Sequence, residues 1–93
     1  MIISFGCKDT ESVWKGNTTR KWSIGIVKVA LRKLFILNAA EDLGDLMIPP
    51  GNKLHKLKGN MKEFRAIRIN DQWRIKFRWK NSNAYNVQIV DYH

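Results

Sequence analysis

The chain has 93 residues and a strongly basic composition, with 17 Lys and Arg residues against 8 Asp and Glu residues. This length predicts a single domain over residues 1–93 whose small core depends on large aromatic side chains. Cys7 is the single cysteine, which excludes an internal disulfide and a cysteine-based zinc site and predicts a cytoplasmic protein. Apolar runs are far too short to span a membrane, and no secretory signal is visible, so no membrane partner is expected.

The positive charge is concentrated between residues 53 and 80. This stretch holds ten basic and two acidic residues, whereas residues 1–52 hold seven and five. A basic block interleaved with aromatic residues favours a polyanion such as RNA or DNA as the partner. Charge alone favours a nucleic-acid partner only slightly, because many small basic domains carry solvated lysines that serve solubility.

The first residues predict an edge or added strand and a brief helix. Ile2–Phe5 is a β-prone run that Gly6 stops. Asp9 or Thr10 is a candidate N-cap for a helix through residue 14 that ends at Gly16.

The main helix is expected to begin after Ser23, a favourable N-cap residue. Apolar residues at positions 24, 27, 31 and 34 form a stripe that we expect to cover a sheet, with Lys28 and Arg32 on another side. Gly44 is the candidate stop for this helix. The consecutive prolines in Met47–Asn52 predict a rigid loop without helix.

Three strand-like runs follow, at residues 63–69, 72–80 and 84–91. In the second run the odd positions from 73 are Trp, Ile, Phe and Trp, and the even positions from 74 are Arg, Lys, Arg and Lys. A strand of this pattern has one apolar face and one cationic face. We therefore expect an α+β fold, with two helices on one face of a small, mainly antiparallel sheet and the other face open and basic.

The hairpin loops predict the strand register. A three-residue loop at 81–83 pairs position 80 with 84 and position 74 with 90, which sets Trp79 opposite Tyr85 on the apolar face. A loop at 70–72 pairs Arg68 with Arg74. It also leaves Arg65 on the apolar face opposite position 77, where a bulge or a snorkelling stem at the strand end would resolve the conflict.

Both histidines lie where phosphoryl chemistry would use them. His55 falls in the basic segment, which is expected to be a loop, and His93 follows the last strand. With Lys58 and Arg74 they supply a base, an acid and cations for cleavage of an RNA strand through its 2′-hydroxyl. This chemistry requires no metal and no other cofactor.

The same residues also admit a plainer interpretation. A terminal histidine is usually solvated, and a histidine beside lysines is often an incidental surface residue. Residue spacing therefore leaves a non-catalytic basic module open as an alternative. The tryptophans are expected in the core, and Tyr92, which the predicted register places with Arg74 on the cationic face, is the candidate for stacking on a base.

Five segments of the sequence give more specific evidence of function than the spacing does. They are Pro49–His55, Leu57–Gly59, Ile67–Ile75, Phe77–Trp79 and Ile89–His93. Together they resemble the HigB-type toxins of the RelE/ParE superfamily, over essentially the whole chain. The resemblance implies a RelE-like fold and the toxin of a bacterial type II toxin–antitoxin pair. It further implies a ribosome-dependent endoribonuclease that cuts messenger RNA in the A site without a metal.

The resemblance also implies partners and site residues. The partners are a small helix-turn-helix antitoxin of the HigA type, the ribosome with its messenger RNA, and operator DNA through the antitoxin complex alone. The residues that match the family's active site are His55, Lys58, Arg74, Asp91, Tyr92 and His93. In our interpretation the histidines transfer protons, Asp91 orients His93, Lys58 and Arg74 hold the phosphate, and Tyr92 stacks. Further RNA contacts are expected from Lys53, Lys56, Arg68, Lys76 and Arg78.

Two other functions stay open at this point. A ParE-like, gyrase-directed toxin would not need RNA-cleaving groups, so their presence disfavours it. A non-catalytic module would bind an antitoxin and repress DNA with it. The chain departs from the family pattern at Lys56, where many relatives have a non-basic residue, and at Phe64, where relatives place the aromatic residue one position later.

Overall fold

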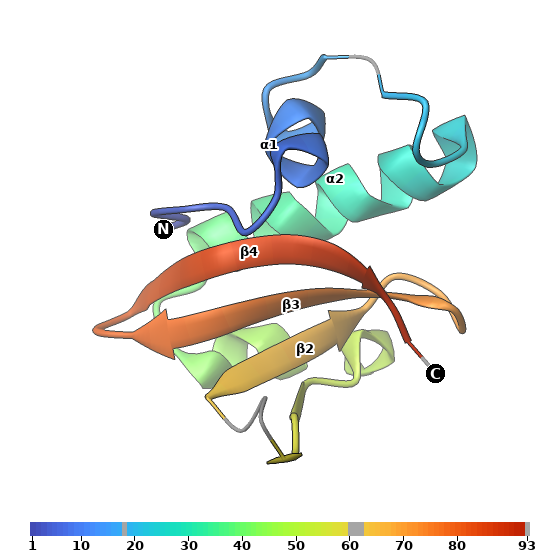
Figure 1. Cartoon of the computed structure of the whole chain (residues 1–93). Helices are drawn as coiled ribbons and strands as arrows, with labels where there is room; N and C mark the ends of the chain where they lie inside the picture. The colour runs from blue at the N-terminus through green and yellow to red at the C-terminus, as the bar shows by residue number, and fades with distance from the viewer. Residues whose placement is uncertain (18, 60–62, 93) are drawn as a thin grey trace.

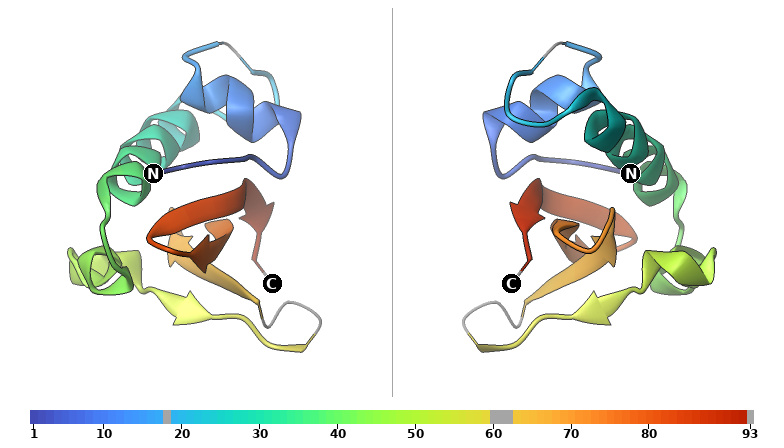
Figure 2. Two further views of the ribbon diagram at one scale, coloured as in Figure 1. Left: turned by 90° about the vertical axis from the view of Figure 1, so that its left-hand side faces the viewer. Right: turned by 90° about the vertical axis from the view of Figure 1, so that its right-hand side faces the viewer.

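The computed structural model describes residues 1–17, 19–59 and 63–92. The predicted α+β architecture is confirmed: two helices pack against a four-stranded antiparallel sheet of order β1-β2-β3-β4. The strands are β1 (His55–Lys56), β2 (Phe64–Arg68), β3 (Trp73–Lys80) and β4 (Asn83–Asp91). Figures 1 and 2 show both helices on one side of the sheet. Among the described residues, no helix is long and apolar enough to cross a bilayer.

The N-terminal segment lies beside β4, as predicted for an added strand. Parallel bridges join Ile2 to Ala84 and Phe5 to Val87. The N–H of Ile3 donates to the Ala84 carbonyl at 2.8 Å. This segment therefore covers the outer edge of β4.

Helix α1 (Lys8–Trp14) begins before either predicted cap. Its N-cap is Cys7, whose side chain makes no capping hydrogen bond, so the assignment of Asp9 or Thr10 as the cap was wrong. Thr10 is buried and its hydroxyl accepts a hydrogen bond from the Ile89 N–H at 2.9 Å. That side chain ties α1 to β4 from inside the helix, where a residue with helical backbone cannot be the N-cap.

Helix α2 (Ile24–Ala39) has the predicted cap, because the Ser23 hydroxyl accepts from the Ile26 N–H at 3.3 Å. Its buried face is rotated from the predicted stripe and consists of Ala30, Lys33, Leu34 and Leu37. Ile24 is 76% exposed, so its assignment to the core was wrong. At 3.6 residues per turn, Ile24 lies about 80° around the helix from Leu34, and it turns away when Leu34 faces the sheet.

Two 3₁₀ turns lie where the sequence predicted the end of the main helix and a loop without helix. They are η1 (Leu43–Met47) and η2 (Pro50–Asn52). α2 ends at Ala39, before the predicted stop at Gly44. Pro50 opens η2, where a missing N–H costs nothing because the first residues of a helical turn have no partner for it.

The hairpin between β2 and β3 has the predicted register. Arg68 lies opposite Arg74, and Arg65 lies opposite Phe77. The ladder is regular, so the half-buried Arg65 is accommodated near the strand end without a bulge.

The hairpin between β3 and β4 differs from its prediction near the turn. Far from the turn Arg74 lies opposite Val90, as expected. The turn itself has two residues, Asn81 and Ser82, both with positive φ (51° and 65°), which suits the twist of paired strands. The register shifts by one residue between Lys76 and Arg78, so Trp79 faces Ala84, and the prediction of Trp79 opposite Tyr85 was wrong.

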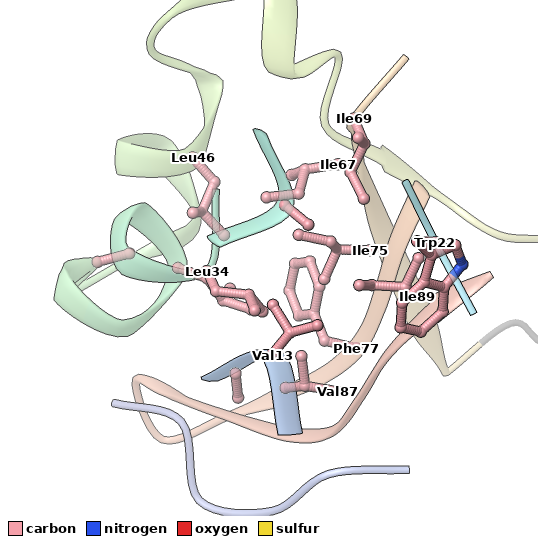
Figure 3. Close-up of a cluster of buried hydrophobic side chains, with 14 residues drawn as sticks. Val13, Trp22, Leu34, Leu46, Ile67, Ile69, Ile75, Phe77, Val87 and Ile89 are labelled. Atoms are coloured by element: carbon pink, nitrogen blue, oxygen red, sulfur yellow. The ribbon is translucent and has the colours of Figure 1, made fainter. Parts of the chain in front are cut away.

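The core lies between α2 and the helix-facing side of the sheet. Leu34 meets the odd-numbered β3 residues Ile75 and Phe77 (Figure 3). Leu37 belongs to the same buried cluster, and all four side chains are fully buried. Burial of each such side chain contributes about 1.5–3 kcal/mol. The even-numbered residues of β3, Arg74 to Lys80, point to the opposite side, which we call the basic face.

Candidate active site

A pocket of about 490 Å³ opens where β1, β3 and the end of β4 meet. Its lining is mostly cationic or aromatic and consists of His55, Lys56, Leu57, Lys58, Lys76, Val90, Asp91 and Tyr92. Asp91 is the one carboxylate among these lining residues. The pocket therefore suits an anionic ligand.

His55 stands in β1, opposite Ala66, and not in a loop as predicted. Its Nδ1 lies 2.9 Å from the carbonyl oxygen of Lys53. Because a carbonyl only accepts, Nδ1 carries the hydrogen, and the neutral ring has its lone pair on Nε2. Nε2 is buried and has no hydrogen-bond partner among the described residues. The ring is thus held in the tautomer that a general base requires.

Tyr92 connects the imidazole to the cationic strand. Its ring meets His55 edge to face, with 5.6 Å between centroids, and the Arg74 guanidinium carbon lies 4.5 Å from the ring centroid. The N–H of Tyr92 donates to the Gln72 carbonyl at 2.6 Å. These contacts place the phenol ring on the basic face, as the strand register predicted.

The turn between β2 and β3 holds the Arg74 guanidinium. One terminal nitrogen donates to the carbonyls of Asn70 and Trp73, and the Nε atom is buried without a partner among the described residues. The Asn70 side chain in turn accepts from the Trp73 N–H at 2.7 Å. Arg74 is therefore oriented by the backbone and keeps donor capacity for a ligand.

Arg68 lies opposite Arg74 but is engaged elsewhere. Its guanidinium binds the Asp71 carboxylate at 2.7 Å. This hydrogen bond, with the arginine's charge, holds the pKa of the Asp71 carboxyl below its ordinary value. The like-charge repulsion between Arg68 and Arg74 is offset locally, and Arg68 is turned to the hairpin loop.

Two further candidate residues, Asp91 and Lys76, line the pocket. Asp91 accepts a hydrogen bond from Gln72 Nε2 at 3.2 Å and lies opposite Trp73. Lys76 lines the pocket but is only 8% exposed, with its ammonium 4.6 Å from the Phe64 ring centroid.

The structure thus gathers His55, Lys58, Arg74, Asp91 and Tyr92 at this end of the sheet. Lys53 and Lys56 are exposed, with Lys56 at the pocket. Arg78 lies at the other end of β3, 3.5 Å from Glu63. His93, the other histidine predicted to transfer protons, lies outside the described residues.

Sequence reasoning missed the support behind His55. Asn52 is fully buried, accepts a hydrogen bond from Lys33 Nζ, and donates to the carbonyls of Leu46 and Ile48 at 3.1 and 3.2 Å. Burial lowers the pKa of the Lys33 ammonium. These bonds fix the loop that presents the Lys53 carbonyl to His55. The available signal was a lysine that shares one side of α2 with the apolar residues Ala30, Leu34 and Leu37.

The family described as the RelE-like toxin of the type II toxin–antitoxin system HigB matches residues 5–93. The chain belongs to this HigB-like toxin family. Membership in a type II toxin–antitoxin family implies an antitoxin partner.

Individual relatives are similar over nearly their whole length. Toxin HigB-1 of Vibrio cholerae is 37% identical over 90 residues, which cover 96% of this chain and 95% of the relative. Endoribonuclease HigB of Proteus vulgaris is 34% identical over 93 residues, with 100% of both chains covered. The crystal structure of YafQ from E. coli strain BL21(DE3) has a TM-score of 0.59 at 16% identity, covering 98% of this chain and 91% of that one, and supports the fold.

Proposed function

We propose that this HigB-like toxin is an endoribonuclease that cuts messenger RNA in the ribosomal A site. One observation carries the proposal. His55 Nε2 and Arg74 Nε are buried polar atoms without partners among the described residues, and both side chains contact Tyr92 beside a cationic pocket. Buried unpartnered polar groups are costly, and a ligand that supplies their partners would remove that cost. The name of the Proteus vulgaris relative, Endoribonuclease HigB, supports the same activity.

His55 supplies the base in the proposed reaction. Its Nε2 lone pair takes the proton of a ribose 2′-hydroxyl, and the oxygen attacks the adjacent phosphorus. The bond from phosphorus to the 5′-oxygen breaks, and an acid protonates the leaving oxygen. The products are a 2′,3′-cyclic phosphate and a 5′-hydroxyl. We assign the acid to His93, which follows Tyr92 in the chain, and each proton transfer contributes about 10²–10⁴-fold to the rate.

The cations of the pocket stabilise the charge that develops on the phosphate. Arg74 is held by the turn carbonyls, its Nε has no partner within the described part of the chain, and the exposed Lys58 lines the pocket. Fixed donors aimed at a developing charge are worth more in a buried site than in water. Tyr92, 43% exposed, offers a ring face or edge on which a base can stack.

The ribosome supplies what the pocket lacks. Basic residues give salt-sensitive affinity for any RNA, but the pocket offers few groups that read base edges. The A site would splay the codon and align the 2′-hydroxyl with its phosphate, an orientation worth roughly several kcal/mol. We further propose that the antitoxin is a HigA-like helix-turn-helix protein, through which the toxin reaches operator DNA.

Primer extension on a translated message tests this proposal. The purified protein is added to ribosomes stalled on a defined message, and in parallel to the same message without ribosomes. We expect cleavage within the A-site codon and very little cleavage of free RNA, with both activities falling as salt rises. Efficient cleavage of free RNA at low protein concentration would contradict ribosome dependence. Absence of any cleavage, with inhibition of gyrase supercoiling, would support the ParE-like alternative.

A further inference from the structure

The β-bulge in β4 places a second tyrosine on the basic face. Without it, Tyr85 would lie opposite Trp79, whose ring packs against the core. The register shift instead sets Tyr85 opposite Arg78. Asn86, with a φ of 53°, takes up the extra residue. Bulges commonly re-aim a side chain in this way.

A second pocket of about 490 Å³ surrounds this tyrosine at the hairpin end. Tyr85, Arg78, Lys80, Asn81 and Asn86 are among its lining residues. A half-buried ring, two cations and two side-chain amides match the groups of a nucleotide: the base stacks, the cations meet phosphate, and the amides reach base edges. The carboxylate in this lining, Glu63, lies 3.5 Å from Arg78 in an exposed pair that contributes little and that a phosphate can replace.

The tyrosines of the two pockets lie toward opposite ends of the cationic strand β3, and the two linings approach each other at Lys76 and Arg78. Figure 1 shows the β3–β4 turn at one end of the sheet and the C-terminal end of β4 at the other. From the level of Gln72, whose carbonyl binds the Tyr92 N–H, to Arg78 is six residues of β3, roughly 20 Å. A stacked nucleic-acid strand rises about 3.4 Å per nucleotide, so about six stacked nucleotides, or fewer extended ones, bridge this distance. Each end pairs a tyrosine with an arginine.

We propose that the Tyr85 pocket is a second RNA subsite, which binds a nucleotide that flanks the cleaved codon in the same single strand. This inference rests on the proposed function, because it needs RNA at the His55 pocket. It also corrects the sequence-based interpretation, in which Tyr92 was the single stacking candidate on the basic face. The subsite extends the RNA path along β3 and away from the reacting phosphate.

Length-dependent RNA binding tests the subsite. The probes are fluorescent 2′-O-methyl RNAs of three and nine nucleotides, which cannot be cleaved because they lack a free 2′-hydroxyl. Anisotropy gives Kd for the wild type and for Tyr85→Ala, Tyr85→Thr and Tyr85→Phe, with thermal unfolding of each variant. If the Tyr85→Ala variant fails to fold, Tyr85→Thr takes its place, because threonine is favourable in strands. Phe35→Ala, which removes an exposed ring on the helix side of the molecule, is the matched control.

We expect the nine-nucleotide probe to lose about tenfold or more in affinity with Tyr85→Ala and Tyr85→Thr. Tyr85→Phe and Phe35→Ala should bind it like the wild type, and the three-nucleotide probe should not distinguish the variants. Unchanged binding of the longer probe, or equal losses for both lengths, would overturn the subsite. Loss of antitoxin affinity with unchanged RNA binding would assign the pocket to the antitoxin and overturn it too. If the wild type fails to cleave ribosome-bound message while the Tyr85 effect persists, the proposed function fails and this RNA contact stands.

Discussion

Replacing Asn52 with alanine should destabilise the fold by about 2.5–6 kcal/mol, although the residue only ends the short 3₁₀ turn η2. Its side chain is fully buried and makes three hydrogen bonds, two to carbonyls and one from the Lys33 ammonium. Each bond to a neutral group contributes about 0.5–1.5 kcal/mol, and the bond to the charged group contributes about 1.5–3 kcal/mol. This loss is a large fraction of the roughly 5–15 kcal/mol that stabilises a typical domain.

Urea unfolding followed by tryptophan fluorescence measures the effect. Trp22 is buried against Trp73, so unfolding changes its environment. Asn17→Ala, at an exposed position, is the matched control and should stay within about 0.5 kcal/mol of the wild type. Asn52→Asp keeps an acceptor for Lys33 but loses both amide donors. Its loss of stability should lie between the losses of Asn52→Ala and Asn17→Ala. A loss below about 1 kcal/mol for Asn52→Ala would refute the idea that this side chain holds the loop.

Three further predictions concern the site and its support. His55→Asn keeps a side-chain donor for the Lys53 carbonyl but has no base, so A-site cleavage should fall at least about a hundredfold while the melting temperature stays unchanged; near-normal cleavage would remove His55 from the reaction. Tyr92→Phe should retain most RNA binding and Tyr92→Leu should lose about fivefold or more, because stacking needs the ring; equal values for the two variants would exclude stacking. The pKa of Lys33 lies below its ordinary 10.5, so the unfolded chain binds this proton more tightly and stability should rise with pH from the lowered pKa up to 10.5. Urea unfolding of Lys33→Met across the same alkaline range should show a flatter dependence, and an unchanged slope would contradict the burial effect.

The two hairpins show where sequence reasoning reaches its limit. Alternating apolar and cationic residues determine which side of β3 faces the core, and the β2–β3 register followed correctly. Near the other turn the same alternation fits a three-residue loop as well as a two-residue turn with a bulge. The backbone conformation of Asn81, Ser82 and Asn86 decides between them, and the alternation pattern does not encode it. The position of Tyr85 was therefore wrong in the prediction.

The prediction of the site was likewise correct for some residues and wrong for others. Arg74 and Tyr92 were predicted on one face because strand register is a local property of a hairpin. His55 was misplaced in a loop because β1 has only two residues and pairs with β2 after an irregular segment. The path of that segment depends on the contact of Asn52 with Lys33, 19 positions earlier in the chain. A pattern read along the chain does not reveal such a long-range contact.

The central claim is that the toxin cuts RNA through the 2′-hydroxyl of its substrate. It is tested most directly with a ribosome-bound message that carries a single 2′-deoxynucleotide at the cleaved position, compared with the unmodified message. We predict that cleavage disappears at the modified position, and that the unmodified message yields a 2′,3′-cyclic phosphate and a 5′-hydroxyl. Continued cleavage of the deoxy-substituted message, with a 5′-phosphate on the product, would contradict the mechanism, because water and not the 2′-hydroxyl would then be the nucleophile.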